Sequence, residues 1–317
     1  MIGTVLSHLL RRKLRSLSFP AQRGRDAKAT TAEALECFEL GAHAALTKAR
    51  PQAIAALELR IPWYRRFFFW EGCACGLSGR HALAPWGNPD LARMTSRYRA
   101  MHSTGYGFWN GVARVYHLPR VPLTRERWAV VPDYDRLSPL IAGGAAFAIT
   151  CAHGVLDSAV LERVKVAGNP DWTRAAFHGC GRALWFLYMH DVGLLEAAIE
   201  AHPEASSELI EGVGVAIAFT QLSRPRRILA TIDRFPPAMQ PGLLRGAGIC
   251  LYQSIEEDPA IRPFISRIKE QRLRQAHSLC ERAATSVADG PGWYWGCDAK
   301  LRSLLPDLSP SERPGAA

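Results

Sequence analysis

The stretch FHGCGRALW, residues 177–185, carries the pattern on which most of the chain is built: glycine inside an apolar segment with helical spacing. Six other segments align with it: FELGAHAAL from Phe38, FWEGCACGL from Phe69, FWNGVARVY from Phe108, LIAGGAAFA from Leu140, LIEGVGVAI from Leu209 and LLRGAGICL from Leu243. Their marker glycines lie 31 to 39 residues apart and are Gly41, Gly72, Gly111, Gly143, Gly179, Gly212 and Gly246. A glycine inside a helix costs about 1 kcal/mol relative to alanine. Its recurrence therefore predicts that neighbouring helix backbones approach closely at these points.

A period of about 35 residues has room for two helices and two short turns. Prolines such as Pro62, Pro119, Pro170 and Pro203 separate the segments, as expected of turns between helices. The pattern predicts an all-α fold: a helical-repeat array of paired helices, solenoid-like or toroidal. We expect a repeat body over residues 26–270, capping helices over 271–308 and a disordered tail over 309–317.

Residues 1–25 form an arm in which apolar residues at helical spacing accompany a cluster of bases, Arg11, Arg12, Lys13 and Arg15. This amphipathic helix is typical either of contact with an anionic membrane surface or of a cap on the first repeat. The net charge of +10 is concentrated here, because the rest of the chain holds 33 bases against 29 acids. Nucleic-acid binding is therefore not expected.

Other sequence features exclude several classes of protein. The eight cysteines form no C-x-x-C pair, and none has the spacing of a zinc site, so we expect reduced thiols in a cytoplasmic protein without metal or cofactor. Gly179-Cys180-Gly181 lacks the third glycine of a dinucleotide fingerprint and follows a helical pattern. No segment approaches the ~18 apolar residues of a membrane span. The signatures of P-loop proteins, zinc proteases and α/β-hydrolases are not present in the sequence either.

The glycine segments also resemble a known family. YRRFFFWEGCACGL, GYGFWNGVARVYHLPR, FHGCGRALWF and LLRGAGICLY together are similar to the bacterial domain-of-unknown-function family 1702, whose members often carry the label "enediyne biosynthesis protein". The resemblance runs from about Leu9 to about Ile261, and its most specific part is residues 179–186. It implies a cytoplasmic accessory protein of natural-product biosynthesis, associated with polyketides, and it supplies no catalytic residues.

Candidate site residues come from the repeat itself. The residue before each marker glycine occupies an equivalent helical position, and five of the seven are polar: Glu71, Asn110, His178, Glu211 and Arg245. Buried polar groups must pair or face a cavity. One interpretation places these five side chains along a shared groove, with Glu71, His178 and Glu211 as acid–base groups and Asn110, Arg245, Arg114 and Arg182 as substrate-binding groups. The other makes the charged residues inter-repeat ion pairs.

Aromatic residues crowd the same segments, among them Trp70, Trp109, Trp185 and several phenylalanines. They are typical of a plain core, or of a pocket for a flat polyene or a developing carbocation. Three functions remain open. One is a helper that binds a hydrophobic intermediate or a biosynthetic enzyme. Another is a cofactor-independent cyclase or isomerase of a polyene or isoprenoid-like substrate, and the third is a pure scaffold.

Overall fold

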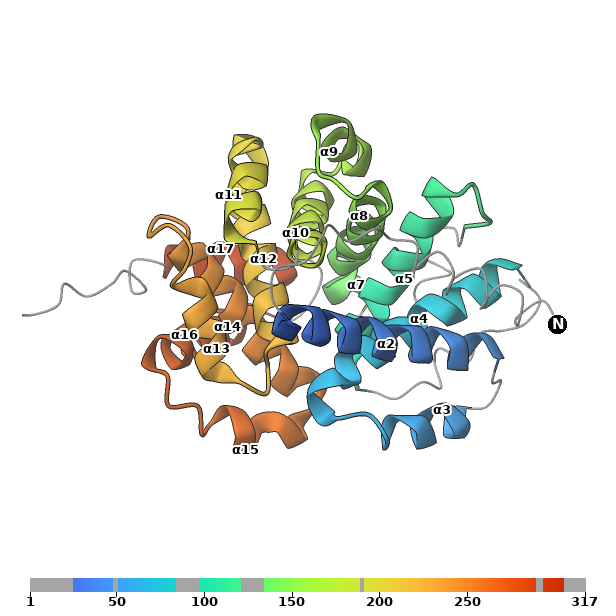
Figure 1. Cartoon of the computed structure of the whole chain (residues 1–317), viewed down its shortest axis with the longest axis horizontal. Helices are drawn as coiled ribbons and strands as arrows, with labels where there is room; N and C mark the ends of the chain where they lie inside the picture. The colour runs from blue at the N-terminus through green and yellow to red at the C-terminus, as the bar shows by residue number, and fades with distance from the viewer. Residues whose placement is uncertain are drawn as a thin grey trace, which may run out of the picture.

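The computed structural model of the 317-residue chain describes residues 25–47, 51–83, 97–120, 134–188, 191–288 and 293–304. Every regular element in those ranges is a helix, which confirms the all-α prediction (Figure 1). The long helices are α2 (Arg25–Thr47), α4 (Arg66–Leu83), α5 (Arg99–Val115), α8 (Pro139–His153), α10 (Pro170–Leu187), α12 (Ser206–Thr220), α14 (Gln240–Glu257) and α16 (Gln271–Thr285). The shorter ones are α3 (Pro51–Glu58), α7 (Tyr134–Leu137), α9 (Ser158–Val164), α11 (Val192–Glu200), α13 (Pro225–Ile232), α15 (Arg262–Ile265) and α17 (Trp293–Ser303), with 3-10 turns η1 (Trp63–Arg65), η3 (Pro203–Ala205) and η4 (Pro259–Ile261).

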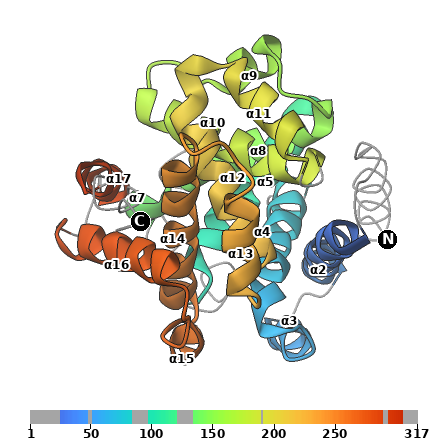
Figure 2. The ribbon, with the colours of Figure 1, turned by 60° about the vertical axis from the view of Figure 1, so that its left-hand side comes forward.

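The long helices pack in the order in which they occur in the chain. Each one contacts the next, from α2 against α4 to α14 against α16. Figure 1 shows this succession across the molecule, with α9 and α11 on the upper side and α3 and α15 along the lower edge. At the far end, α17 packs on α16 and also contacts α7, as Figure 2 shows from another side.

The marker glycines lie where neighbouring long helices touch. A Cβ atom added to Gly212 of α12 would lie 2.1 Å from the carbonyl oxygen of His178 in α10. On the other side of α12, a Cβ atom on Gly214 would lie 2.3 Å from the carbonyl oxygen of Leu243 in α14. Contacts this short leave no room for a side chain, so only glycine permits the approach. The predicted reason for the recurring glycines is therefore confirmed.

Local sequence signals explain several of the helix boundaries. Asp157, Asn169 and Asp191 cap α9, α10 and α11, each accepting a hydrogen bond from the backbone N–H three residues later. Proline occupies the first turn of α8, α10, α13 and α14, where its missing N–H has no partner to lose. Gly154 ends α8 with φ of 73°, a left-handed conformation that favours glycine. These caps position α10, which carries several of the candidate residues.

Helices from the first half of the chain also contact helices from the second half. The backbone N–H of Ala100, at the start of α5, donates to Glu257 Oε1 at the end of α14, at 2.9 Å. Tyr98 donates its hydroxyl to Asp258 Oδ2 at 2.9 Å. Arg65 donates Nη1 to the carbonyl oxygen of Thr220, at the end of α12. These contacts close the interior between α4 and α5 on one side and α12 and α14 on the other.

The predicted domain limits fall partly outside the described residues. The N-terminal arm lies outside them except for its last residue, where α2 begins, and the tail 309–317 lies wholly outside them. The predicted body contains α2 to α15, and the predicted capping region contains α16 and α17.

Candidate functional site

Seven phenylalanine side chains surround a narrow cavity of about 60 Å³ between the long helices. They form a continuous series of ring contacts with centroid separations of 4.8 to 6.4 Å. In order of contact, this phenylalanine belt consists of Phe38, Phe108, Phe147, Phe186, Phe68, Phe219 and Phe67. The belt draws on α2, α4, α5, α8, α10 and α12, so its cavity exists only when all six helices are assembled.

Among the described residues that line this cavity, only Glu71 and Arg182 have charged side chains. Neither of them forms an ion pair within the part of the chain that is described, and the Nε and Nη2 atoms of Arg182 have no hydrogen-bond acceptor there. The guanidinium of Arg182 instead lies 5.8 Å from the ring centre of Phe147. Burial raises the pKa of Glu71 from 4.5 to about 7, although the positive charge of Arg182 opposes the shift. Glu71 is therefore a carboxyl group that exchanges its proton near neutral pH.

Two more cavities, of about 110 and 100 Å³, continue the interior beyond the phenylalanine belt. Arg182 and Phe219 belong to the walls of the first and second cavities, and His178 and Tyr294 belong to the walls of the second and third. Burial lowers the pKa of His178 to about 3, and the neighbouring arginines act in the same direction. At neutral pH this imidazole is neutral, so it can accept or donate a hydrogen bond but carries no charge.

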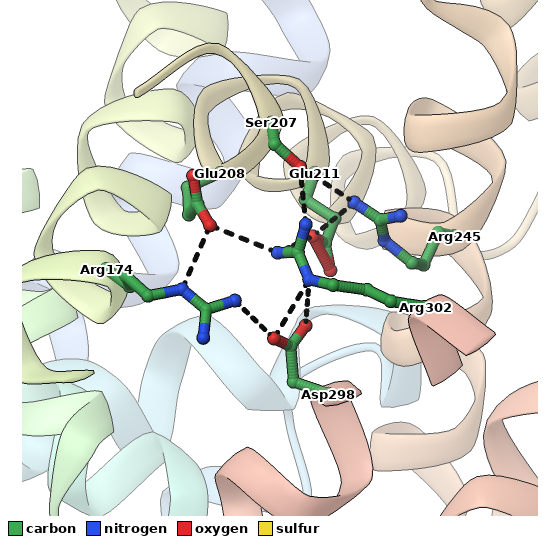
Figure 3. Close-up of polar contacts among 7 residues, drawn as sticks. All are labelled: Arg174, Ser207, Glu208, Glu211, Arg245, Asp298 and Arg302. Atoms are coloured by element: carbon green, nitrogen blue, oxygen red, sulfur yellow. Dashed lines mark hydrogen bonds and ion pairs between the residues drawn. The ribbon is translucent and has the colours of Figure 1, made fainter. Parts of the chain in front are cut away.

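Beside the third cavity, a network of charged side chains joins α17 to α10, α12 and α14 (Figure 3). Arg245 Nη2 donates to Glu211 Oε2 at 2.7 Å, and both side chains are almost fully buried. Arg302 of α17 donates to the same oxygen at 3.1 Å and to Glu208 Oε1 at 3.1 Å. Asp298 accepts from Arg302 Nε at 3.0 Å, so α17 contributes both an acid and a base.

The network is extended by Arg174 of α10 and by Ser207 of α12. Arg174 donates to Glu208 Oε1 at 3.1 Å and to Asp298 Oδ2 at 2.5 Å. Ser207 Oγ accepts from Arg245 at 3.3 Å and from Arg302 at 2.5 Å. Glu211 thus has two arginine partners, which fits the ion-pair interpretation of the sequence better than an acid–base role.

The remaining predicted residues lie away from the three cavities. Trp70, Trp109 and Trp185 are at most 2% exposed and pack in the core: Trp70 stacks on Tyr98, Trp109 fills the space beside Gly79, and Trp185 donates its Nε1–H to Thr220 at 3.0 Å. Asn110 is buried and donates to the carbonyl oxygen of Tyr106 within its own helix. Arg114 is exposed at the end of α5 and lines none of the described cavities.

Helix geometry explains why three phenylalanines of the belt line the cavity and two of the predicted tryptophans do not. At about 100° per residue, positions four and seven residues after a glycine return to nearly the same helix face. Phe147, Phe186 and Phe219 stand at those positions after Gly143, Gly179 and Gly212. Trp70 and Trp109 stand two residues before their marker glycines and project from the opposite side. The signal was present in the sequence, but reasoning from aromatic content alone did not use it.

Several other features bear on what the site can do. In the described ranges, no cluster of three or more His, Cys, Asp or Glu side chains could hold a metal ion. None of the helices searched there is long and apolar enough to cross a membrane. All eight cysteines are free thiols, and six of them are buried. Burial raises the pKa of the Cys180 thiol to about 12, which argues against its use as a nucleophile.

In the part of the chain that the structure describes, the fold is all-helical and its phenylalanine belt encloses the carboxyl group of Glu71 and the guanidinium of Arg182. The chain belongs to the family described as "Protein of unknown function (DUF1702)", whose model matches residues 2–221. This confirms the resemblance seen in the glycine segments. The matched range includes Glu71, Arg182 and Glu211, and it ends before Arg245 and α17. Neither a curated protein nor a solved structure matches the chain.

Proposed function

We propose that this protein binds a hydrophobic, unsaturated small molecule in its interior and serves as a cytoplasmic accessory protein of natural-product biosynthesis. The observation that carries the proposal is the phenylalanine belt around Glu71 and Arg182. Aromatic rings offer flat apolar surfaces on which a conjugated chain stacks, and one or two polar groups then fix its orientation. The polyketide or enediyne-like pathway is part of the proposal and derives from the resemblance alone.

The cavity volumes set a condition on this function. Drug-sized ligands occupy pockets of roughly 300 to 1,000 Å³. The three cavities are each much smaller, and only together do they come close to the lower limit. A ligand therefore spans more than one of them, and it enters by rotating the side chains at their shared walls, Phe219 and Arg182.

We further propose that the fold is a paired-helix repeat array with a period near 35 residues. Its support is the contact of each long helix with the next and the glycine at each contact. The shorter helices α3, α9, α11 and α13 then act as the second helix of each pair. An array of this kind buries a continuous interior only when several repeats stack, which fits a cavity built from six helices.

A second function, catalysis by acid–base chemistry, is favoured by the pKa of Glu71. A carboxyl group whose pKa is about 7 is present in both protonation states at neutral pH, as general acid–base catalysis requires. In that role neutral Glu71 gives its proton to a carbon of the polyene, and the phenylalanine faces stabilise the resulting carbocation. Arg182 stabilises the Glu71 carboxylate, which takes back a proton from another carbon of the rearranged product. No cofactor takes part in this scheme, and the reaction is an isomerisation or a cyclisation.

Metabolite profiling of the producing host, with and without the gene, tests the proposal. We expect loss of the gene to change the spectrum of hydrophobic products, and the wild-type gene to restore it. Complementation with Glu71→Gln separates the two functions, because a binding protein tolerates the amide whereas an acid–base catalyst does not. Ala216→Phe, which fills the cavity, should abolish complementation in either case. Full complementation by Ala216→Phe would overturn the proposed function.

A further inference from the structure

We propose that the ligand is an amphiphile with an anionic head group, which binds in an arginine-rich groove outside the phenylalanine cavity. This inference rests on the proposed function and adds the polar end of the ligand to it. The groove has a volume of about 590 Å³, far larger than the three interior cavities. It is lined by residues of α2, η1, α11, α12 and α13 and by the segments beside them.

The charge of the groove favours an anion. Among the residues that the structure describes, four arginines and two carboxylates line it: Arg65, Arg224, Arg227, Arg234, Glu33 and Asp191. Asp191 Oδ1 already accepts a hydrogen bond as the cap of α11. Arg224 and Arg234 are exposed and form no ion pair among the described residues. The first turn of α11 also faces the groove, and its backbone N–H groups add positive potential.

Arg65 connects this groove to the phenylalanine cavity. Its guanidinium lies 6.0 Å from the ring centre of Phe68, which belongs to the phenylalanine belt. On the groove side, its Nη2 atom donates to Glu33 Oε2 at 3.1 Å. Two pairs of adjacent residues also separate the groove from the cavity. Glu33 lines the groove and Ala34 lines the cavity, and likewise Thr220 lines the groove and Phe219 lines the cavity.

Glu33 shows how a carboxylate fits this position. Its side chain is 55% exposed, so it holds Arg65 from the solvent side and is not itself locked in place. Arg65 is nearly fully buried and keeps a second hydrogen bond to the carbonyl oxygen of Thr220. A ligand carboxylate or phosphate that replaces Glu33 on Arg65 places its hydrocarbon chain directly at the belt. The anionic group then stays among the arginines, and the apolar chain is buried.

Fluorescence binding of parinaric acid, a conjugated polyene fatty acid, to the full-length protein tests this arrangement. We expect the acid to bind and its methyl ester to bind about tenfold more weakly, because a charged hydrogen bond to arginine is lost. The double substitution Arg224→Gln and Arg234→Gln should weaken binding of the acid about tenfold and leave binding of the ester unchanged. Arg226→Gln is the matched control, because Arg226 lies in α13 between the two substituted arginines, its side chain is 87% exposed, and it pairs with Glu270 outside the groove.

The variant Glu33→Gln distinguishes ligand binding by Arg65 from a purely structural role of the Arg65–Glu33 pair. Removing the carboxylate of Glu33 should strengthen binding of the acid about threefold, because the ligand then no longer competes with Glu33 for Arg65. Displacement of parinaric acid by dodecanoate or by dodecyl phosphate then identifies which head group the arginines prefer. Equal binding of acid and ester, or equal losses in the double variant and in Arg226→Gln, would overturn this inference while the proposed function stands. Binding of neither compound would overturn both.

Discussion

Replacing Gly212 with alanine should separate two of the long helices and destabilise the fold. The added Cβ atom would lie 2.1 Å from the carbonyl oxygen of His178 and 2.9 Å from the backbone nitrogen of Arg182, both in α10. Ordinary van der Waals contact begins at 3.4 Å. Because the obstructing atoms belong to the backbone of a packed helix, no side chain can move aside to relieve the overlap. The helices α10 and α12 must themselves move apart.

The magnitude follows from two opposing effects. Alanine gains about 1 kcal/mol over glycine in a helix interior. Overpacking of a close contact costs about 3 kcal/mol when the backbone has to shift. The net loss is therefore about 2 kcal/mol of the free energy of unfolding. For a protein of 317 residues, that loss lowers the melting temperature by about 3 °C.

Urea unfolding followed by circular dichroism, with a thermal melt alongside, measures this loss. Gly193→Ala is the matched control, since Gly193 also lies in a helix, but its nearest neighbour for an added Cβ is Asp191 Oδ1 at 3.6 Å. The control should be neutral or gain up to about 1 kcal/mol. If Gly212→Ala were as stable as Gly193→Ala, the glycines would not be required for helix contact, and this reasoning would be refuted.

Three other predictions concern the interior. Because the pKa of Glu71 is raised from 4.5 to about 7, the folded protein holds a proton that the unfolded chain has lost between those pH values, and stability falls as pH rises through that window. Between pH 5 and pH 8, the free energy of unfolding of the wild type, measured by urea titration, should therefore fall by about 2 kcal/mol relative to that of Glu71→Gln. If the free energies of the two proteins changed in parallel with pH, the raised pKa of Glu71 would be contradicted. Arg245→Met should cost about 3 kcal/mol, and adding Glu211→Leu should restore most of it in a double-mutant cycle, because a buried carboxylate is then no longer left with too few partners. Trp185→Phe should cost about 1 to 2 kcal/mol through the lost hydrogen bond to Thr220 but leave parinaric acid binding unchanged, and a loss of binding would place Trp185 in the site after all.

Some of the candidate site could be predicted because it depends on helical register. The position before each marker glycine selected Glu71 and His178, and the structure places both at the walls of interior cavities. The same position also selected Asn110, whose side chain bonds within its own helix. Identical register places side chains on equivalent helix faces, but it does not say whether the neighbouring helix leaves a cavity there or fills it.

The ion pairs made by α17 and the arginine-rich groove were beyond the reach of sequence reasoning. Arg302 of α17 donates to Glu211 across 91 residues of chain, and Asp298 of α17 accepts from Arg174 across 124 residues. No local sequence pattern indicates either contact. Arg65 and Thr220 are separated even further and meet through the closure of α4 onto α12. Such pairings depend on how all the intervening helices pack against one another, which no single segment of sequence specifies.

The recurring glycine with its helical surroundings determined, from sequence alone, that this is an all-helical protein whose long helices touch through their backbones. Those features depend on residues close together in the chain, and helix propensity and steric bulk act locally. Tertiary structure alone decided that seven phenylalanines from six helices enclose one cavity, that Glu71 and Arg182 face it, and that Glu211 is held by arginines. These outcomes depend on burial and on side chains meeting across the interior, which exist only once the helices have packed together.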